Sequence, residues 1–172
     1  MPKVDRTKTQ PTERQAYPGK LLHRTDGCWK TRLADPLGLT QMGVGEVELQ
    51  PGSATGLLHY HYGADEMIYV LEGEVTLVEE GGVEQVLTAG DAAGWKAGDV
   101  VGHTIENRSD KPARLLEIGT RPSEDTAVYL GYDLMYRARN GVDITITSRS
   151  GRPYQAGEEV PEIEELPLEA RR

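Results

Sequence analysis

The chain has 172 residues, of which 37% are hydrophobic and 27% are charged, and its formal net charge is −9. This length suits a single domain. The acidic balance disfavours nucleic acid and anionic membranes as partners, and no apolar run approaches the ~20 residues that a membrane-spanning helix needs.

Residues 1–19 are polar, slightly basic and interrupted by three prolines. This composition predicts a flexible N-terminal arm. The arm contains no apolar stretch of the kind that secretory signals have. The only cysteine, Cys28, has no partner for an internal disulfide. Both features favour a reducing, cytoplasmic location.

Residues 20–155 contain short apolar runs separated by turn residues. The runs recur at the ~8–12-residue spacing of all-β sandwiches and barrels, and no long segment has a helical period. The dipeptide Gly81-Gly82 between two runs predicts a hairpin. The sequence therefore predicts one all-β domain. Its apolar runs are residues 42–52, 56–62, 66–82, 83–90, 91–98, 103–110, 113–120, 127–137 and 143–151.

The stretch HYHYGADE, residues 59–66, holds two of the four histidines of the chain. In a strand, His59 and His61 point to the same face, ~6.5–7 Å apart, so both imidazoles can bind one ion. Glu66 begins the next apolar run and can add a carboxylate oxygen. A mixed nitrogen and oxygen ligand set of this kind suits Fe, Mn, Ni, Cu or Zn better than Ca or Mg.

The run MIYVL, residues 67–71, is apolar at every position and therefore on both faces of a strand. A face in contact with water needs polar side chains, so another part of the structure must cover this sheet. The N-terminal arm and a second subunit are the two candidates. We favour a homodimer.

A second stretch, GDAAGWKAGDVVGHTIEN at residues 90–107, contains His103 and Asn107. Together with His59-Tyr60-His61, Glu66 and Gly73, these residues resemble the two sequence signatures of the cupin superfamily. Two differences stand out: Lys96 occupies the place of the usual proline, and the gap between Gly98 and His103 is two residues longer than usual. The likeness covers residues 20–155 and is greatest to small bacterial single-domain cupins, most of which have no established function.

The resemblance implies a double-stranded antiparallel β-barrel, or jelly roll, with one metal ion inside. It places the four metal ligands at His59, His61, Glu66 and His103. The ion would be one divalent transition metal, and the choice among Fe, Mn, Ni, Zn and Cu stays open. A barrel that keeps these residues without a metal is the alternative. His23 lies outside the pattern and is expected on the surface.

Several residues near the motifs have structural explanations. Tyr60 and Tyr62 alternate with the two histidines, so we expect them to pack rather than to take part in chemistry. Packing is also the expected role of Trp29 and Trp95. Asn107 is expected to cap a turn or to bind the backbone. Turns with positive φ are expected at Gly73, Gly90 and Gly98.

Residues 156–172 are acidic and contain two prolines, which predicts a solvated C-terminal tail. Docking of its apolar residues on a partner surface is the alternative. Just before it in the chain, Tyr132 and Asp133 form part of a feature that recurs in the family. Asp133 has no assigned role, and anchoring of the chain end is one candidate.

No lysine or arginine occurs between Leu33 and Trp95. A polyanionic sugar phosphate is therefore a less expected ligand than a small keto, enol or aromatic compound. If the ligand carries a carboxylate, its counter-charge is expected from later arginines. These are Arg108, Arg114, Arg121, Arg137 and Arg139.

Four protein ligands leave two positions of an octahedral ion open, which is typical of catalytic rather than structural metals. We therefore expect a small metalloenzyme of dioxygenase, isomerase or lyase type that acts on a small oxygenated organic molecule. A non-catalytic cupin that binds or senses a small molecule is the alternative. Beyond the four ligands, the sequence identifies no catalytic residue.

Overall fold

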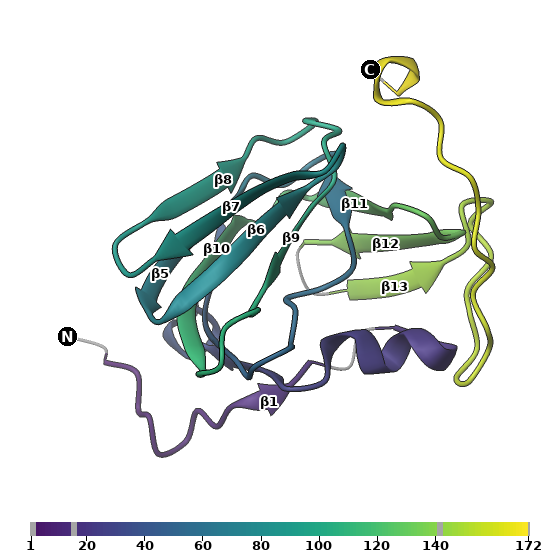
Figure 1. The fold of residues 1–172 in the computed structure, drawn as a ribbon. Coiled ribbons are helices and arrows are strands. Elements are labelled where there is room, and N and C mark those ends of the chain that lie inside the picture. The colour runs from purple at the N-terminus through teal and green to yellow at the C-terminus, as the bar shows by residue number, and fades with distance from the viewer. Residues whose placement is uncertain (1–2, 15–16, 141–142, 172) are drawn as a thin grey trace.

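The computed structural model describes residues 3–14, 17–140 and 143–171, and most of its regular structure is β-strand (Figure 1). The strands are β1 (Thr12–Glu13), β2 (Cys28–Arg32), β3 (Met42–Leu49), β4 (His59–His61), β5 (Glu66–Glu72), β6 (Glu74–Glu79), β7 (Val83–Thr88), β8 (Ala92–Trp95), β9 (His103–Glu106), β10 (Ala113–Thr120), β11 (Glu124–Tyr129), β12 (Leu134–Arg139) and β13 (Asp143–Thr147). The 3₁₀ helices are η1 (Gly19–Thr25), η2 (Asp35–Leu37) and η3 (Leu168–Ala170).

The strands form two antiparallel sheets. The first sheet has the order β1-β2-β3-β10-β5-β8, and the second has the order β13-β12-β11-β4-β9-β6-β7. Strands far apart in the chain are hydrogen-bonded neighbours, as in β3 with β10 and β4 with β11, because the chain crosses repeatedly between the sheets. The predicted double-stranded antiparallel jelly roll is confirmed.

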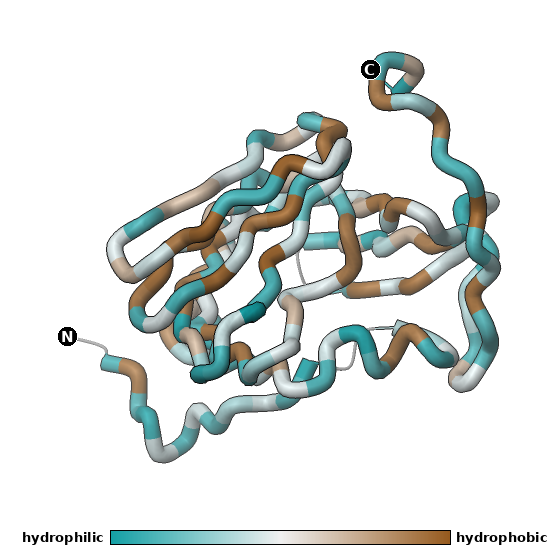
Figure 2. The backbone as a smooth tube through the Cα atoms, viewed as in Figure 1, coloured by the Kyte–Doolittle hydropathy of each residue, from teal (hydrophilic) through white to brown (hydrophobic). Residues whose placement is uncertain are grey.

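The two sheets bury their apolar side chains between them. Val47 and Leu49 of β3, Val70 of β5 and Leu115 of β10 are fully buried in one cluster, with Ile105 of β9 opposite them. Burial of such a side chain contributes ~1.5–3 kcal/mol. Figure 2 shows hydrophobic and hydrophilic segments interleaved along the strands, as the alternation of strand faces requires.

At one end of the barrel the inward-facing residues change from apolar to polar. Along β5, Val70 and Ile68 are buried, and the next inward position is Glu66. Its register partner on β10 is Gly119. This end of the barrel therefore presents a carboxylate and, beside it, a position without a side chain.

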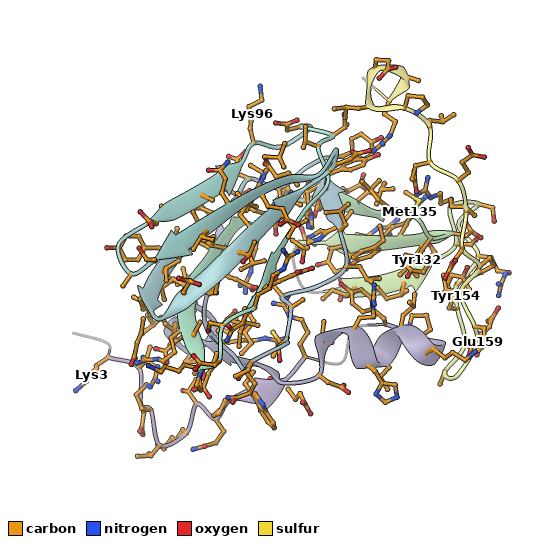
Figure 3. All side chains as sticks on the ribbon, in the orientation of Figure 1. Lys3, Lys96, Tyr132, Met135, Tyr154 and Glu159 are labelled. Atoms are coloured by element: carbon orange, nitrogen blue, oxygen red, sulfur yellow. The ribbon has the colours of Figure 1, made fainter. Side chains whose placement is uncertain are left out.

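The two extra residues before His103 are absorbed in the loop that follows β8. Gly98 has a φ of 79° and donates its N–H to the carbonyl of His61, which ties the loop to β4. Val100 is buried, and Lys96 points away from the barrel in Figure 3. His103 keeps its place as the register partner of His59.

Strand β2 and helix η1 lie outside the predicted apolar runs, near the N-terminus. Both contain mixed polar and apolar residues, so neither shows a clear hydrophobic period. Arg14 N–H donates to Cys28 O, and Arg6 pairs with Glu46 of β3. These contacts tie the N-terminal residues to the first sheet.

The C-terminal residues lie along the second sheet rather than apart from it. Ile163 N–H donates to Gly131 O, and Leu168 packs near a buried cluster that includes Leu130. The Asp133 carboxylate accepts hydrogen bonds from Arg149 N–H and the Tyr154 hydroxyl, so it holds the segment 149–154 that precedes the C-terminal residues. Tyr132 and Tyr154 lie beside this segment in Figure 3. The division into arm (1–19), barrel (20–155) and tail (156–172) stays a prediction.

None of the helices in the described part of the chain is long and apolar enough to cross a membrane.

Candidate metal centre

The four predicted ligands come from three strands that face the barrel interior. His59 and His61 lie on β4, His103 on the adjacent β9, and Glu66 at the start of β5 in the opposite sheet. The three histidine side chains are largely buried, whereas 31% of the Glu66 side chain is exposed. The site is therefore enclosed on the histidine side and reached by solvent on the side of Glu66.

The outer nitrogen of each imidazole faces a hydrogen-bond acceptor. His59 Nδ1 lies 2.7 Å from Leu57 O, and His61 Nδ1 lies 2.5 Å from Asp125 Oδ2. His103 Nδ1 lies 3.4 Å from the carbonyl of Val101. A carbonyl oxygen only accepts hydrogen bonds, so Nδ1 carries the proton in His59 and His103. In a neutral ring the lone pair is then on Nε2.

The inner nitrogens converge on Glu66. Nε2 of His103 lies 3.2 Å from Glu66 Oε2, that of His61 lies 3.5 Å from Oε1, and that of His59 lies 3.9 Å from Oε2. The ligand atoms of His59, His61 and Glu66 all lie within 4.8 Å of one another, and His103 joins this group through Glu66.

This arrangement fits a cation. Lone pairs on the imidazoles face the lone pairs of a carboxylate, and such groups repel each other unless a proton or a metal ion lies between them. Two ligand atoms that are each ~2.1 Å from one ion are ~3.0–3.4 Å apart, and the observed distances of 3.2 to 3.9 Å are close to this spacing. Imidazole and carboxylate are also the donors that transition metals prefer.

The protonation of the site follows from burial and from these contacts. Burial lowers the pKa of His59 to about 4, which keeps this ring neutral. In His61, burial also lowers the pKa, but the hydrogen bond to Asp125 and the charge of Glu66 outweigh it and raise the pKa above its usual value. Burial alone would raise the pKa of Glu66, yet the three imidazoles hold it well below its ordinary range. Glu66 is therefore a carboxylate at neutral pH.

Asp125, on β11, belongs to the site although no sequence motif indicated it. Its Oδ2 accepts from His61, and its Oδ1 accepts the N–H of Gly63 at 2.9 Å. Despite burial, the hydrogen bond to His61 holds the pKa of Asp125 below its usual value. A buried aspartate thus fixes the ring orientation of one candidate ligand.

Aromatic rings surround the histidines. Trp95 stacks on His103 with ring centroids 3.7 Å apart, and its Nε1 donates to Glu79 Oε1. The predicted packing role of Trp95 is confirmed, but its partner is a site histidine. Tyr129 contacts His59 with ring centroids 5.5 Å apart, and Tyr136 contacts His61 at 6.0 Å.

The expectations for the other residues near the motifs are met in part, since Tyr62 and Trp29, which were expected to pack, are 49% and 38% exposed. Tyr60 is buried in an apolar cluster with Val100, and the fully buried Asn107 donates to Leu49 O and Lys111 O. His23 is exposed on η1. Positive φ angles occur at Gly73, Gly90 and Gly98.

The sequence profile of the cupin domain matches residues 45–119. A sugar phosphate isomerase of the cupin superfamily from Silicibacter pomeroyi is 39% identical in sequence. That match covers 90% of this chain and 98% of the other, and the two structures superimpose with a TM-score of 0.81. The polyketide cyclase RemF from Streptomyces resistomycificus shares the fold at 24% identity, with 70% of this chain and 79% of that chain covered and a TM-score of 0.57.

Among curated proteins, the tetracenomycin polyketide synthase protein TcmJ of Streptomyces glaucescens is 34% identical over 95 residues. This match covers 55% of the present chain, and the chain spans only 61% of that relative. The profile, the near-complete match to the Silicibacter protein and the two-sheet fold agree. The chain belongs to the cupin superfamily.

Proposed function

We propose that this protein is a metal-dependent enzyme that holds one divalent transition metal (Fe, Mn, Ni, Zn or Cu) with His59, His61, Glu66 and His103. One observation carries the proposal: the Nε2 atoms of three imidazoles converge on the carboxylate of Glu66. The Nδ1 atom of each of these rings faces a different acceptor. A barrel built for packing alone gains nothing from burying three imidazoles and a carboxylate together.

The proposed reaction is an isomerisation of a small hydroxy-carbonyl compound through proton transfer next to the carbonyl group. A bound metal supplies a Lewis acid that polarises a carbonyl or enolate oxygen. Tyr136 places a hydroxyl-bearing ring beside His61, with ring centroids 6.0 Å apart. Burial and the neighbouring carboxylates raise the pKa of Tyr136, so it stays protonated and can donate to a substrate oxygen.

The likeness to the Silicibacter protein favours isomerase over dioxygenase or lyase chemistry, because it extends over nearly the whole of both chains. Chemistry on a polyketide-derived compound is the second candidate, and the likeness to TcmJ favours it. A cupin that binds its ligand without turnover is the alternative to both reactions. The activity test described below distinguishes it from an enzyme.

The metal assignment is tested by elemental analysis of protein purified without added metal or an affinity tag. We expect close to one equivalent of a transition metal in the native protein. His61→Ala and His103→Ala should each lower the metal content sharply, with an unchanged far-ultraviolet circular dichroism spectrum. His23→Ala is the matched control, since His23 is exposed outside the site. Full metal content in both site variants would reject the four-ligand assignment.

The reaction class is tested by incubating the metal-loaded protein with a panel of aldoses, ketoses and their phosphates in heavy water. An isomerase should place solvent deuterium at the carbon next to the carbonyl, detectable by NMR, and His61→Ala should abolish this exchange. Oxygen consumption with any substrate of the panel would favour a dioxygenase instead. Retention of a compound without exchange or conversion would favour a binding protein.

A homodimer is part of the same proposal. Met67, Tyr69 and Leu71 lie on the outward face of β5 and are 40%, 38% and 37% exposed. The N-terminal residues contact β2 and β3 and leave these side chains uncovered. The sequence suggested that either the N-terminal arm or a second subunit covers this face of the sheet. A second subunit is the candidate that remains. A small-molecule ligand, a cytoplasmic location and the absence of nucleic-acid and membrane partners stay predictions.

A further inference from the structure

Three charged side chains meet inside the barrel, close to the candidate metal centre but separate from it. Glu117 lies on the inward face of β10, because it follows the buried Ala113 and Leu115 at every second position of the strand. Arg14 Nη2 lies 2.6 Å from Glu117 Oε2, and Lys30 Nζ lies 2.5 Å from the same oxygen. Two cations therefore share one carboxylate oxygen.

In the described part of the chain, this cluster holds two cations and one carboxylate, so one positive charge has no ion-pair partner of its own. Within the described residues, neither Arg14 nor Lys30 forms an ion pair with a carboxylate other than Glu117. Arg14 also donates to Thr55 O at 2.5 Å, whereas the ammonium group of Lys30 keeps two N–H donors without a protein acceptor. A partly buried surplus charge is costly unless an anion compensates it.

Three of the five arginines that the sequence suggested as counter-charges pair with other carboxylates: Arg108 with Glu84, Arg114 with Glu72 and Arg121 with Asp35. Lys30 and Arg14 were missed because they precede the long segment without basic residues. Lys30 enters the barrel from β2, and Arg14 enters it just after β1.

The surplus charge lies within reach of the metal centre. Glu66 is the register partner of Gly119, and Glu117 is the register partner of Ile68, so the two carboxylates are diagonal neighbours on one face of adjacent strands. Such neighbours are ~7–8 Å apart. A ligand with a few carbon atoms spans this distance.

One glycine leaves room beside Glu66, and a second gives the Lys30 side chain its path to Glu117. A Cβ atom added to Gly119 would meet only Asp65 O, at 3.5 Å, so the space beside Glu66 is open there. A Cβ atom added to Gly45 would lie 2.5 Å from Cε of Lys30. Gly45 is thus the residue that allows the Lys30 side chain to reach Glu117.

We propose that Arg14 and Lys30 bind the oxyanion of a small ligand, a carboxylate or a phosphate, whose other end lies at the metal centre. Glu117 compensates one of the two charges in the free protein and leaves the other to attract the anion. The position of the ligand's other end rests on the proposed function, whereas the basic pair itself requires no metal.

The test measures binding of inorganic phosphate and of acetate by titration calorimetry, with full-length protein both treated with a chelator and loaded with metal. In the chelator-treated protein, Lys30→Gln should weaken anion binding roughly tenfold, because a charge-assisted hydrogen bond is lost. Glu117→Gln should tighten it roughly threefold, because a competing anion is removed. Gly45→Ala should weaken it without removing any charge. Arg108→Gln is the control and should bind as the native protein does.

The anion that binds more tightly identifies the ligand as a phosphate or a carboxylate. A merely structural ion cluster would give no anion binding in either the native protein or Glu117→Gln, and this result would overturn the proposal. Equal binding by Lys30→Gln and the native protein would do the same. Binding that appears only after metal loading would assign the anion to the metal and reject the basic pair, while leaving the metal proposal intact.

Discussion

The three site histidines differ in what holds their outer nitrogens. His59 and His103 face backbone carbonyls, whereas His61 faces the carboxylate of Asp125. A charged acceptor strengthens the hydrogen bond and gives the ring more anionic character, which makes it a stronger metal ligand. Of the three imidazoles, His61 is therefore the one whose affinity for a metal would depend most on its neighbour.

Asp125→Asn should weaken metal binding by roughly 10–100-fold while the barrel still folds. The substitution removes the negative charge behind His61 but keeps the size of the side chain. Competition with a chelator of known affinity measures the dissociation constant. Asp91→Asn is the control, since the Asp91 side chain accepts hydrogen bonds from Thr88 at an exposed turn, away from the candidate metal centre. A native-like dissociation constant in Asp125→Asn would show that the carboxylate does not act through His61.

The candidate ligand residues could be picked out from the sequence because most of their spacing is local. His59, His61 and Glu66 lie within a single octet, and His103 follows in the second motif. Asp125 and Tyr136 were not predictable, because they come from later strands whose position beside β4 depends on the whole sheet order. A single aspartate or tyrosine in an apolar run carries no sign of which strand it will face.

At the scale of the elements, Glu117 joins three parts of the chain that are distant in sequence. It sits on β10 and binds Lys30 of β2 and Arg14 just after β1. Despite burial, the two cations lower the pKa of Glu117 to about 2. The ion cluster thus links the N-terminal residues to the barrel wall.

Glu117→Gln should alter the acid dependence of stability. The folded pKa is about 2 against an ordinary 4.5, so the ionised group stabilises the folded state above pH 4.5 and loses this contribution as the pH falls through 2. The contribution is on the order of 3 kcal/mol. Urea unfolding between pH 6 and pH 2 should give a flatter profile for the variant. Glu84→Gln, at an exposed position, should change the profile less, and identical profiles for all three proteins would contradict the ion cluster.

Most strands were predictable as elements, since alternation and turn residues mark them. The runs at 42–52, 66–82 and 113–120 contain β3, β5, β6 and β10. Strand β2 was missed because its sequence, CWKTR, buries a cysteine and a threonine beside a lysine that bonds inside the barrel. Polar residues with internal partners break the alternation on which the prediction depends.

At the scale of the whole molecule, the outward face of the first sheet carries exposed apolar side chains where polar ones would be expected. Leu116 and Ile118 of β10 are the register partners of Tyr69 and Met67 of β5. Their side chains point outward together, which gives a continuous apolar face. Burying such a face against a second copy would stabilise a dimer.

Light scattering coupled to size-exclusion chromatography should therefore give twice the chain mass of 18.9 kDa. Tyr69→Glu should produce monomers, because it places a charge in the centre of the apolar face. Val86→Glu is the control, since Val86 is 60% exposed on β7, in the other sheet. A monomeric native protein would exclude this assembly.

All four candidate ligands lie inside the matched segment 45–119, whereas Arg14, Lys30, Asp125 and Tyr136 lie outside it. The candidate ligands and the groups that would surround a substrate therefore lie on separate stretches of chain. Replacing residues 1–32 and 120–139 by those of another cupin would change the groups around a substrate and leave the four candidate ligands in place.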